Sequence, residues 1–94
     1  MKVVVSSKYL ARKLSEIDFD KENMYDVSLE NDVLKIGASI TTIEVSCQSM
    51  YSKNETINQS NARWDWVKKL VNSVSEQPIT LHISENAVNV IFQY

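Results

Sequence analysis

The sequence predicts an α+β fold in which two helices pack on one face of an antiparallel sheet. Three observations lead to this prediction. Apolar and polar residues alternate in several short runs, as in strands with one buried face. Two other segments carry apolar residues at helical spacing. The heptapeptide ENDVLKI at 30–36 recurs as ENAVNVI at 85–91, which indicates a repeated supersecondary unit.

The chain opens with a predicted strand and helix. Residues 2–5 are rich in valine, which favours a strand. Ser6 or Ser7 is expected to cap the following helix by accepting a hydrogen bond from a first-turn amide. This helix should end near Asp18, because residues 20–23 show no apolar period. The residues on its apolar face are Leu10, Leu14 and Ile17.

A meander of three strands is predicted next. The turn between the first two falls at residues 30–32, where Asn31 and Asp32 tolerate left-handed dihedrals. The polar stretch 49–60 lacks a period and is predicted to be a loop, with a short edge strand near residues 50–51 as an alternative. The inward-facing residues of the three strands are Tyr25, Val27, Leu29, Leu34, Ile36, Ala38, Ile43, Val45 and Cys47.

The second half predicts another helix and a hairpin. Ser60 or Asn61 is the expected helix cap, and Trp64 is placed at the margin of the apolar stripe. Pro78 should end the helical segment because it lacks an amide donor. A turn is expected at residues 85–86. The helical stripe comprises Trp66, Val67, Leu70, Val71 and Val74, and the inward strand residues are Ile79, Leu81, Ile83, Val88, Val90, Phe92 and Tyr94.

Size and composition bound the class of protein. The 94 residues are expected to form one domain, and the net charge of −2 argues against nonspecific attraction to nucleic acid or anionic membranes. The N-terminus lacks the apolar stretch of a signal peptide, and Cys47 has no internal disulfide partner. We therefore expect a cytoplasmic protein that does not bind membranes.

No catalytic constellation is visible. His82 is predicted to point outward from its strand and Cys47 inward, so their pairing as nucleophile and base is not favoured. One histidine and one cysteine do not make a usual zinc set, and a single glycine cannot build a phosphate-binding loop. We predict a protein that is not an enzyme and uses no cofactor or metal.

The element order, together with three local sequences, resembles one domain of a DNA sliding clamp. These are MKVVV at the start, Leu10 and Leu14 after Tyr9, and WVKKL at 66–70 before the last two strands. The resemblance implies two half-units, residues 1–48 and 49–94, with both helices on the same side. Such rings contain six domains, each made of two half-units. A chain of this length supplies one domain, so it would have to form a hexamer to encircle DNA.

The same resemblance implies DNA contacts through the helices, which carry six of the ten basic residues. A basic cluster of this kind neutralises phosphates. The alternative is that lysine and arginine simply occupy solvated helix faces, which the acidic balance of the chain favours. The six residues are Lys8, Arg12, Lys13, Arg63, Lys68 and Lys69.

Half of the twelve carboxylates lie between residues 18 and 32, and they suggest a docking surface for a basic protein. A solvated loop and strand face is the alternative. Trp64 and Tyr51, with Asp65 beside them, form a second candidate patch, because tryptophan and tyrosine are frequent binding anchors. The six clustered acidic residues are Asp18, Asp20, Glu22, Asp26, Glu30 and Asp32.

In size, acidity and absence of a catalytic site the chain is similar to immunity proteins of bacterial toxin systems. That resemblance implies a monomer or dimer that binds and neutralises a cognate toxin domain, such as a basic nuclease. The leading hypothesis is therefore a protein-binding module. The alternative is a clamp-like nucleic-acid accessory protein that oligomerises through its sheet edges and contacts DNA with its helices.

Overall fold

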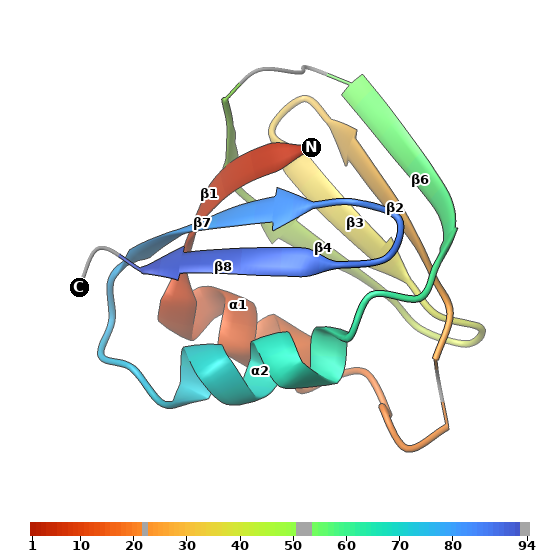
Figure 1. Ribbon diagram of the computed structural model, residues 1–94, viewed down its shortest axis with the longest axis horizontal. Helices are drawn as coiled ribbons and strands as arrows, with labels where there is room; N and C mark the ends of the chain where they lie inside the picture. Colours follow the sequence, from red (N-terminus) through yellow and green to blue (C-terminus); the bar gives the residue numbers. More distant parts are fainter. Residues whose placement is uncertain (22, 51–53, 93–94) are drawn as a thin grey trace.

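The computed structural model describes residues 1–21, 23–50 and 54–92, and it has an α+β architecture (Figure 1). Two antiparallel four-stranded sheets enclose the core, and both helices lie side by side below them. The elements in chain order are β1 (Lys2–Ser6), α1 (Ser7–Leu14), β2 (Tyr25–Glu30), β3 (Val33–Gly37), β4 (Thr42–Ser46), β5 (Gln48–Ser49), β6 (Asn54–Ser60), α2 (Trp64–Asn72), β7 (Pro78–Ile83) and β8 (Val88–Phe92).

The strands form two sheets, so the prediction of one sheet is wrong while the α+β class is confirmed. Sheet A has the order β5-β1-β7-β8, and sheet B has the order β4-β3-β2-β6. The first strand of each half pairs with a strand of the other half. Val3 of β1 lies opposite Leu81 of β7, and Val27 of β2 lies opposite Ile57 of β6. This exchange splits the strands into two sheets, and local sequence patterns do not reveal it.

The core is one continuous apolar cluster that both sheets and both helices share. The predicted alternation is confirmed in β2, where Tyr25, Val27 and Leu29 are buried between exposed or half-buried neighbours. Leu10 and Leu14 of α1 are also completely buried. Burying a side chain of this size is worth roughly 1.5–3 kcal/mol, so the two helices and two sheets stabilise one another.

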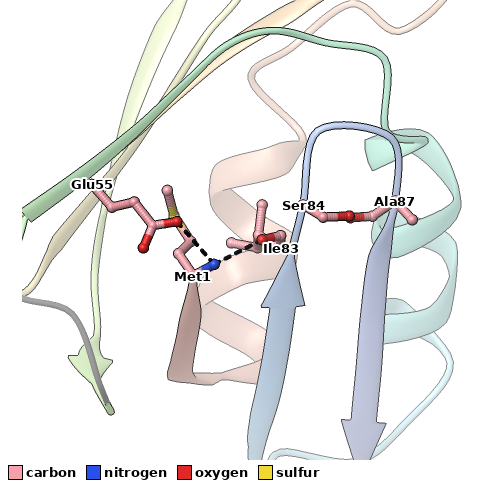
Figure 2. Close-up of polar contacts among 5 residues, drawn as sticks. All are labelled: Met1, Glu55, Ile83, Ser84 and Ala87. Atoms are coloured by element: carbon pink, nitrogen blue, oxygen red, sulfur yellow. Dashed lines mark hydrogen bonds and ion pairs between the residues drawn. The ribbon is translucent and has the colours of Figure 1, made fainter.

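The amino group of Met1 links the two sheets. It lies 3.1 Å from a carboxylate oxygen of Glu55 on β6 and donates a 2.8 Å hydrogen bond to the carbonyl oxygen of Ile83 on β7 (Figure 2). Glu55 belongs to sheet B and Ile83 to sheet A, so these contacts tie an edge of one sheet to the middle of the other.

Residues 54–60 form strand β6 rather than the predicted loop. β6 is an edge strand that pairs with β2 and packs only one side on the core, which explains its polar sequence NETINQS. The alternative, a short edge strand near residues 50–51, is found slightly earlier in the chain: the two-residue strand β5 lies at the edge of sheet A, and Met50 forms a bend directly after it. Residue 51 lies outside the described residues.

Helix α2 is rotated relative to the prediction. Trp64 is completely buried, whereas Trp66 is 53% exposed and Leu70 42% exposed. The core-facing residues are spaced i, i+3 and i+7 from Trp64, and a helix turns about 100° per residue, so Trp66 emerges on the far side. Neither expected cap is used. Arg63 is the N-cap residue of α2 and makes no side-chain cap, whereas Ser6 caps α1 as predicted by accepting from the Tyr9 amide.

The two repeated heptapeptides close different hairpins. In the first, Asn31 and Asp32 adopt positive φ angles of 50° and 61° as a two-residue turn between Glu30 and Val33, which confirms that turn. In the second, Ile83 pairs with Val88, so four residues form the connection. Both returning strands begin at the fourth residue of the heptapeptide, but opposite faces are buried: Leu34 and Ile36 are buried, whereas the equivalent Asn89 and Ile91 are exposed.

Candidate protein-binding surfaces

The predicted acidic cluster is spread along the whole of β2. Asp18 and Asp20 lie in the connection between α1 and β2, whereas Glu30 and Asp32 lie at the opposite end of the strand. Asp26 is separated from Glu30 by four residues, or about 13 Å along a strand. All five are exposed, and Glu22 lies outside the described residues. The structure therefore does not bring these residues together into one compact cluster.

Three of these carboxylates hold backbone segments in place. A carboxylate oxygen of Asp18 accepts from the amide of Asp20 at 3.1 Å. Asp26 accepts from the amide of Gln59 at 2.9 Å, where β6 has a positive φ of 57° and the register with β2 shifts. Asp32 accepts from both the amide and the hydroxyl of Ser49, at 3.2 and 2.8 Å. These bonds lower the pKa of Asp32. The negative charges of all three carboxylates nevertheless remain at the surface.

The outward side of sheet B gathers negative charge that the sequence alone does not bring together. Strand alternation directs Asp26 and Glu30 of β2 and Glu44 of β4 to this side. Lys35 of β3 lies opposite Glu44 in the register and is the one cation among these four. We call Asp26, Glu30 and Glu44 the acidic face. Within residues 1–21, 23–50 and 54–92, no ion pair within 4.0 Å involves any of the three.

Glu44 was not predicted as a binding residue. Its alternation with Ile43 and Val45 predicts that it points outward, but only the register of β3 with β4 places it near Glu30. A shallow hollow of about 210 Å³ lies between them, lined by Glu30, Asn31, Val33, Lys35 and Glu44. The hollow is open, its exposed lining is about half apolar, and its shape suits contact with a protruding side chain better than enclosure of a small molecule.

The predicted patch of Tyr51, Trp64 and Asp65 does not form a binding surface. Trp64 is completely buried, and its indole Nε1 has no hydrogen-bond partner among the described residues. Asp65 is half-buried and forms a bidentate pair with Arg63 at 2.9 and 2.7 Å, which lowers its pKa. Tyr51 lies outside the described residues. The exposed tryptophan is Trp66, which was predicted to lie in the apolar stripe of the helix.

The six basic side chains lie on the helical side of the molecule, and five of them lie over aromatic rings. The guanidinium of Arg63 and the ammonium of Lys69 lie 5.7 and 5.3 Å from the ring centroid of Trp66. Lys68 lies 5.9 Å from the ring of Phe19. Arg12 and Lys13 lie 5.6 and 5.9 Å from the ring of Tyr9. Lys8 is exposed on α1. Five of these cations therefore gather around three aromatic rings on and beside the two packed helices.

Cys47 and His82 do not form a catalytic pair. Cys47 is half-buried beside a hollow lined by residues of β1, β4, β5 and the start of β7, and His82 is not among them. Burial and the charge of Asp32 raise the pKa of the Cys47 thiol, so the nucleophilic thiolate is disfavoured at neutral pH. In the described part of the chain, no three His, Cys, Asp or Glu side chains lie together as a metal site.

Neither described helix is long and apolar enough to cross a lipid bilayer. Comparisons with protein-family models, curated proteins and solved structures found no match to this chain.

Proposed function

We propose that this protein is a non-enzymatic protein-binding module, and that it acts as an immunity protein that binds and neutralises a toxin domain in the cytoplasm. The acidic face is the observation that carries this proposal. Three exposed carboxylates lie on an extended sheet surface, and no cation within the described residues forms an ion pair with them. Such a surface attracts a basic partner and orients it before contact.

A nuclease toxin has the complementary chemistry. A protein that binds nucleic acid must present lysine and arginine side chains to the phosphates. An acidic protein surface competes for these cations and covers the substrate-binding region. Glu30, Glu44 and Lys35 all line the hollow on sheet B, so a protruding lysine or arginine of the toxin would meet two carboxylates and one ammonium group there.

The test begins with the toxin domain encoded next to this protein. Co-expression of the two proteins should restore growth, and the purified proteins should form a complex. Glu44→Lys should lower the association rate constant about tenfold at low ionic strength, because it reverses a charge within the acidic face. Glu16→Lys makes the same change after α1, on the helical side, and should leave the rate unchanged.

An unchanged association rate with Glu44→Lys would contradict the assignment of the acidic face. If only Glu16→Lys lowers the association rate constant, the interface lies on the helices. If neither a neighbouring toxin nor growth rescue is found, the proposed immunity function is wrong.

A clamp-like nucleic-acid accessory protein is the second candidate. Two observations support it. The strand preceding each helix and the strand following it lie in different sheets, and the buried serines Ser7 and Ser60 occupy the two strand–helix junctions. The six predicted basic residues also lie on or at the start of the two helices, which pack against each other. This function predicts a hexameric mass and DNA binding that weakens steeply with salt, which light scattering and fluorescence anisotropy would measure.

A further inference from the structure

Among the sheet edges of the described molecule, β8 is the one with more than two residues and no charged side chain. β8 pairs with β7 on one side only, and residues 88–92 contain neither a charge nor a proline. The other sheet edges are protected. β4 carries Glu44, β6 carries Glu55, and β5 is only two residues long. Charges and short lengths are the usual devices against edge pairing, and β8 has neither.

The hydrogen-bond pattern shows which backbone groups this edge presents. Residues of an antiparallel strand direct their N–H and C=O groups alternately to one side and the other. Ile83 of β7 exchanges both bonds with Met1, and the next residue, Ser84, donates to Ala87 at 2.9 Å at the start of the β8 hairpin (Figure 2). By this alternation Asn89 and Ile91 bond to β7. The outward N–H and C=O groups therefore belong to Val88, Val90 and Phe92.

These three residues are symmetric about Val90. If a second β8 strand approaches antiparallel with Val90 opposite Val90, then Val88 of each strand lies opposite Phe92 of the other. All outward N–H and C=O groups of the described strand then pair across a two-fold axis. No charged side chain on either strand opposes this contact.

Helix α2 extends the same surface. It packs against β8 and runs alongside it in the same direction (Figure 1). Lys68 lies against Phe19, on the side of α1, and Leu70 emerges roughly 160° away around the helix. Leu70 and Trp66 are therefore exposed next to one another on α2, and the cations of Arg63 and Lys69 lie 5.7 and 5.3 Å from the Trp66 ring centroid.

We propose that this protein associates with a second copy of itself through a two-fold β8–β8 contact, flanked by Trp66 and Leu70. A neutral, self-complementary edge selects its own sequence, and two-fold contacts are the commonest in homo-oligomers. The surface is small for a permanent dimer, so we expect a dissociation constant on the order of 10–100 μM.

Sedimentation equilibrium up to about 0.5 mM protein tests the association. Leu70→Lys should weaken it at least tenfold, because it adds a positive charge to the exposed side of α2 in each copy, next to Arg63 and Lys69. Asn72→Lys adds the same charge to the same helix, about 160° from Leu70, and should have no effect. A wild-type protein that stays monomeric over this range overturns the proposal, as does equal weakening by both variants.

Cross-linking tests the register. In a Cys47→Ser background, Val90→Cys should form an intermolecular disulfide, because directly opposed hydrogen-bonded residues have Cα atoms about 5.5 Å apart. Ile91→Cys should not, because its copies would lie about 8 Å apart. Preferential cross-linking through Ile91→Cys overturns the pairing about Val90. Thr42→Lys on β4 should leave association unchanged. If the Thr42→Lys variant no longer associates, the contact is instead a head-to-tail pairing between β8 and β4.

Discussion

Glu76 shows how one exposed carboxylate can join two distant parts of the chain. It accepts hydrogen bonds from the Ser6 hydroxyl at 2.8 and 2.9 Å and from the Ser7 hydroxyl at 3.3 Å, and the amide of Lys8 lies 3.5 Å away. These donors lie at the N-terminus of α1, where a negative charge is favourable. The hydrogen bond from Ser6 is the main cause of the lowered pKa of Glu76.

Glu76→Gln should therefore lower stability at neutral pH but not in acid. The folded-state pKa of Glu76 lies below its ordinary value of 4.5, so its charge contributes stability above that value. The contribution is lost as the pH falls through the folded-state pKa. Urea unfolding should show a lower midpoint for the variant at pH 7 and converging midpoints near pH 3. A difference that persists in acid would attribute the effect to shape rather than charge.

The two tryptophans of α2 should differ sharply in their effect on stability. Trp64 is completely buried, and its truncation to alanine leaves a large cavity, so Trp64→Ala should cost about 3–5 kcal/mol. Trp66 is 53% exposed, and Trp66→Ala should change the free energy of unfolding by about 0.5 kcal/mol or less. Chemical denaturation measures both. Comparable losses would mean that Trp66 also packs in the core.

At the scale of the element, the two hairpins offer a matched comparison. Asn31 has a φ of 50°, a conformation that a β-branched residue adopts only with strain. Asn31→Val should therefore destabilise the protein by about 1–2 kcal/mol. Asn86 occupies the turn of the second heptapeptide but has no positive φ, so Asn86→Val should cost little. Thermal unfolding of the two variants measures the difference, and equal losses would contradict this distinction.

Local signals predicted most elements correctly, because alternation and helical spacing report burial directly. They placed the inward residues of β2, β3, β4 and β7, and they predicted the turn at Asn31 and Asp32. β6 was missed because its pairing with β2 stabilises a strand whose sequence is almost wholly polar. The phase of α2 was wrong because Trp64 and Trp66 carry equal hydrophobic weight, and only tertiary packing decides between them.

The candidate surfaces were less predictable than the elements, since a surface depends on register between strands. Asp26 and Glu30 were predicted as binding residues, but Glu44 joins them only through the pairing of β3 with β4. Trp64 was predicted as an anchor and is buried, whereas Trp66 and Leu70 are exposed beside β8. Residues that meet through long-range pairing leave no local periodic signal, so neither surface can be predicted from the sequence alone.

At the scale of the whole molecule, charge and apolar surface are separated. The acidic face lies on the outward side of sheet B, the basic residues lie on the helices, and the neutral edge belongs to sheet A. A two-fold contact through β8 occupies the edge of sheet A and leaves the acidic face of sheet B open. A head-to-tail ring that pairs β8 with β4 would use the same edge, so that ring and the dimer are mutually exclusive assemblies.

This separation predicts the stoichiometry of the neutralised complex. The disulfide-linked Val90→Cys dimer, in the Cys47→Ser background, should bind two toxin domains, one on each acidic face, with the same association rate per site as the monomer. Glu44→Lys should lower that rate about tenfold in both forms, because its surface is remote from the β8 contact. Light scattering gives the mass of the complex, and stopped-flow mixing gives the rates. Binding of a single toxin per linked dimer would mean that the two surfaces overlap, and faster DNA binding than toxin binding by the monomer would favour the clamp-like function instead.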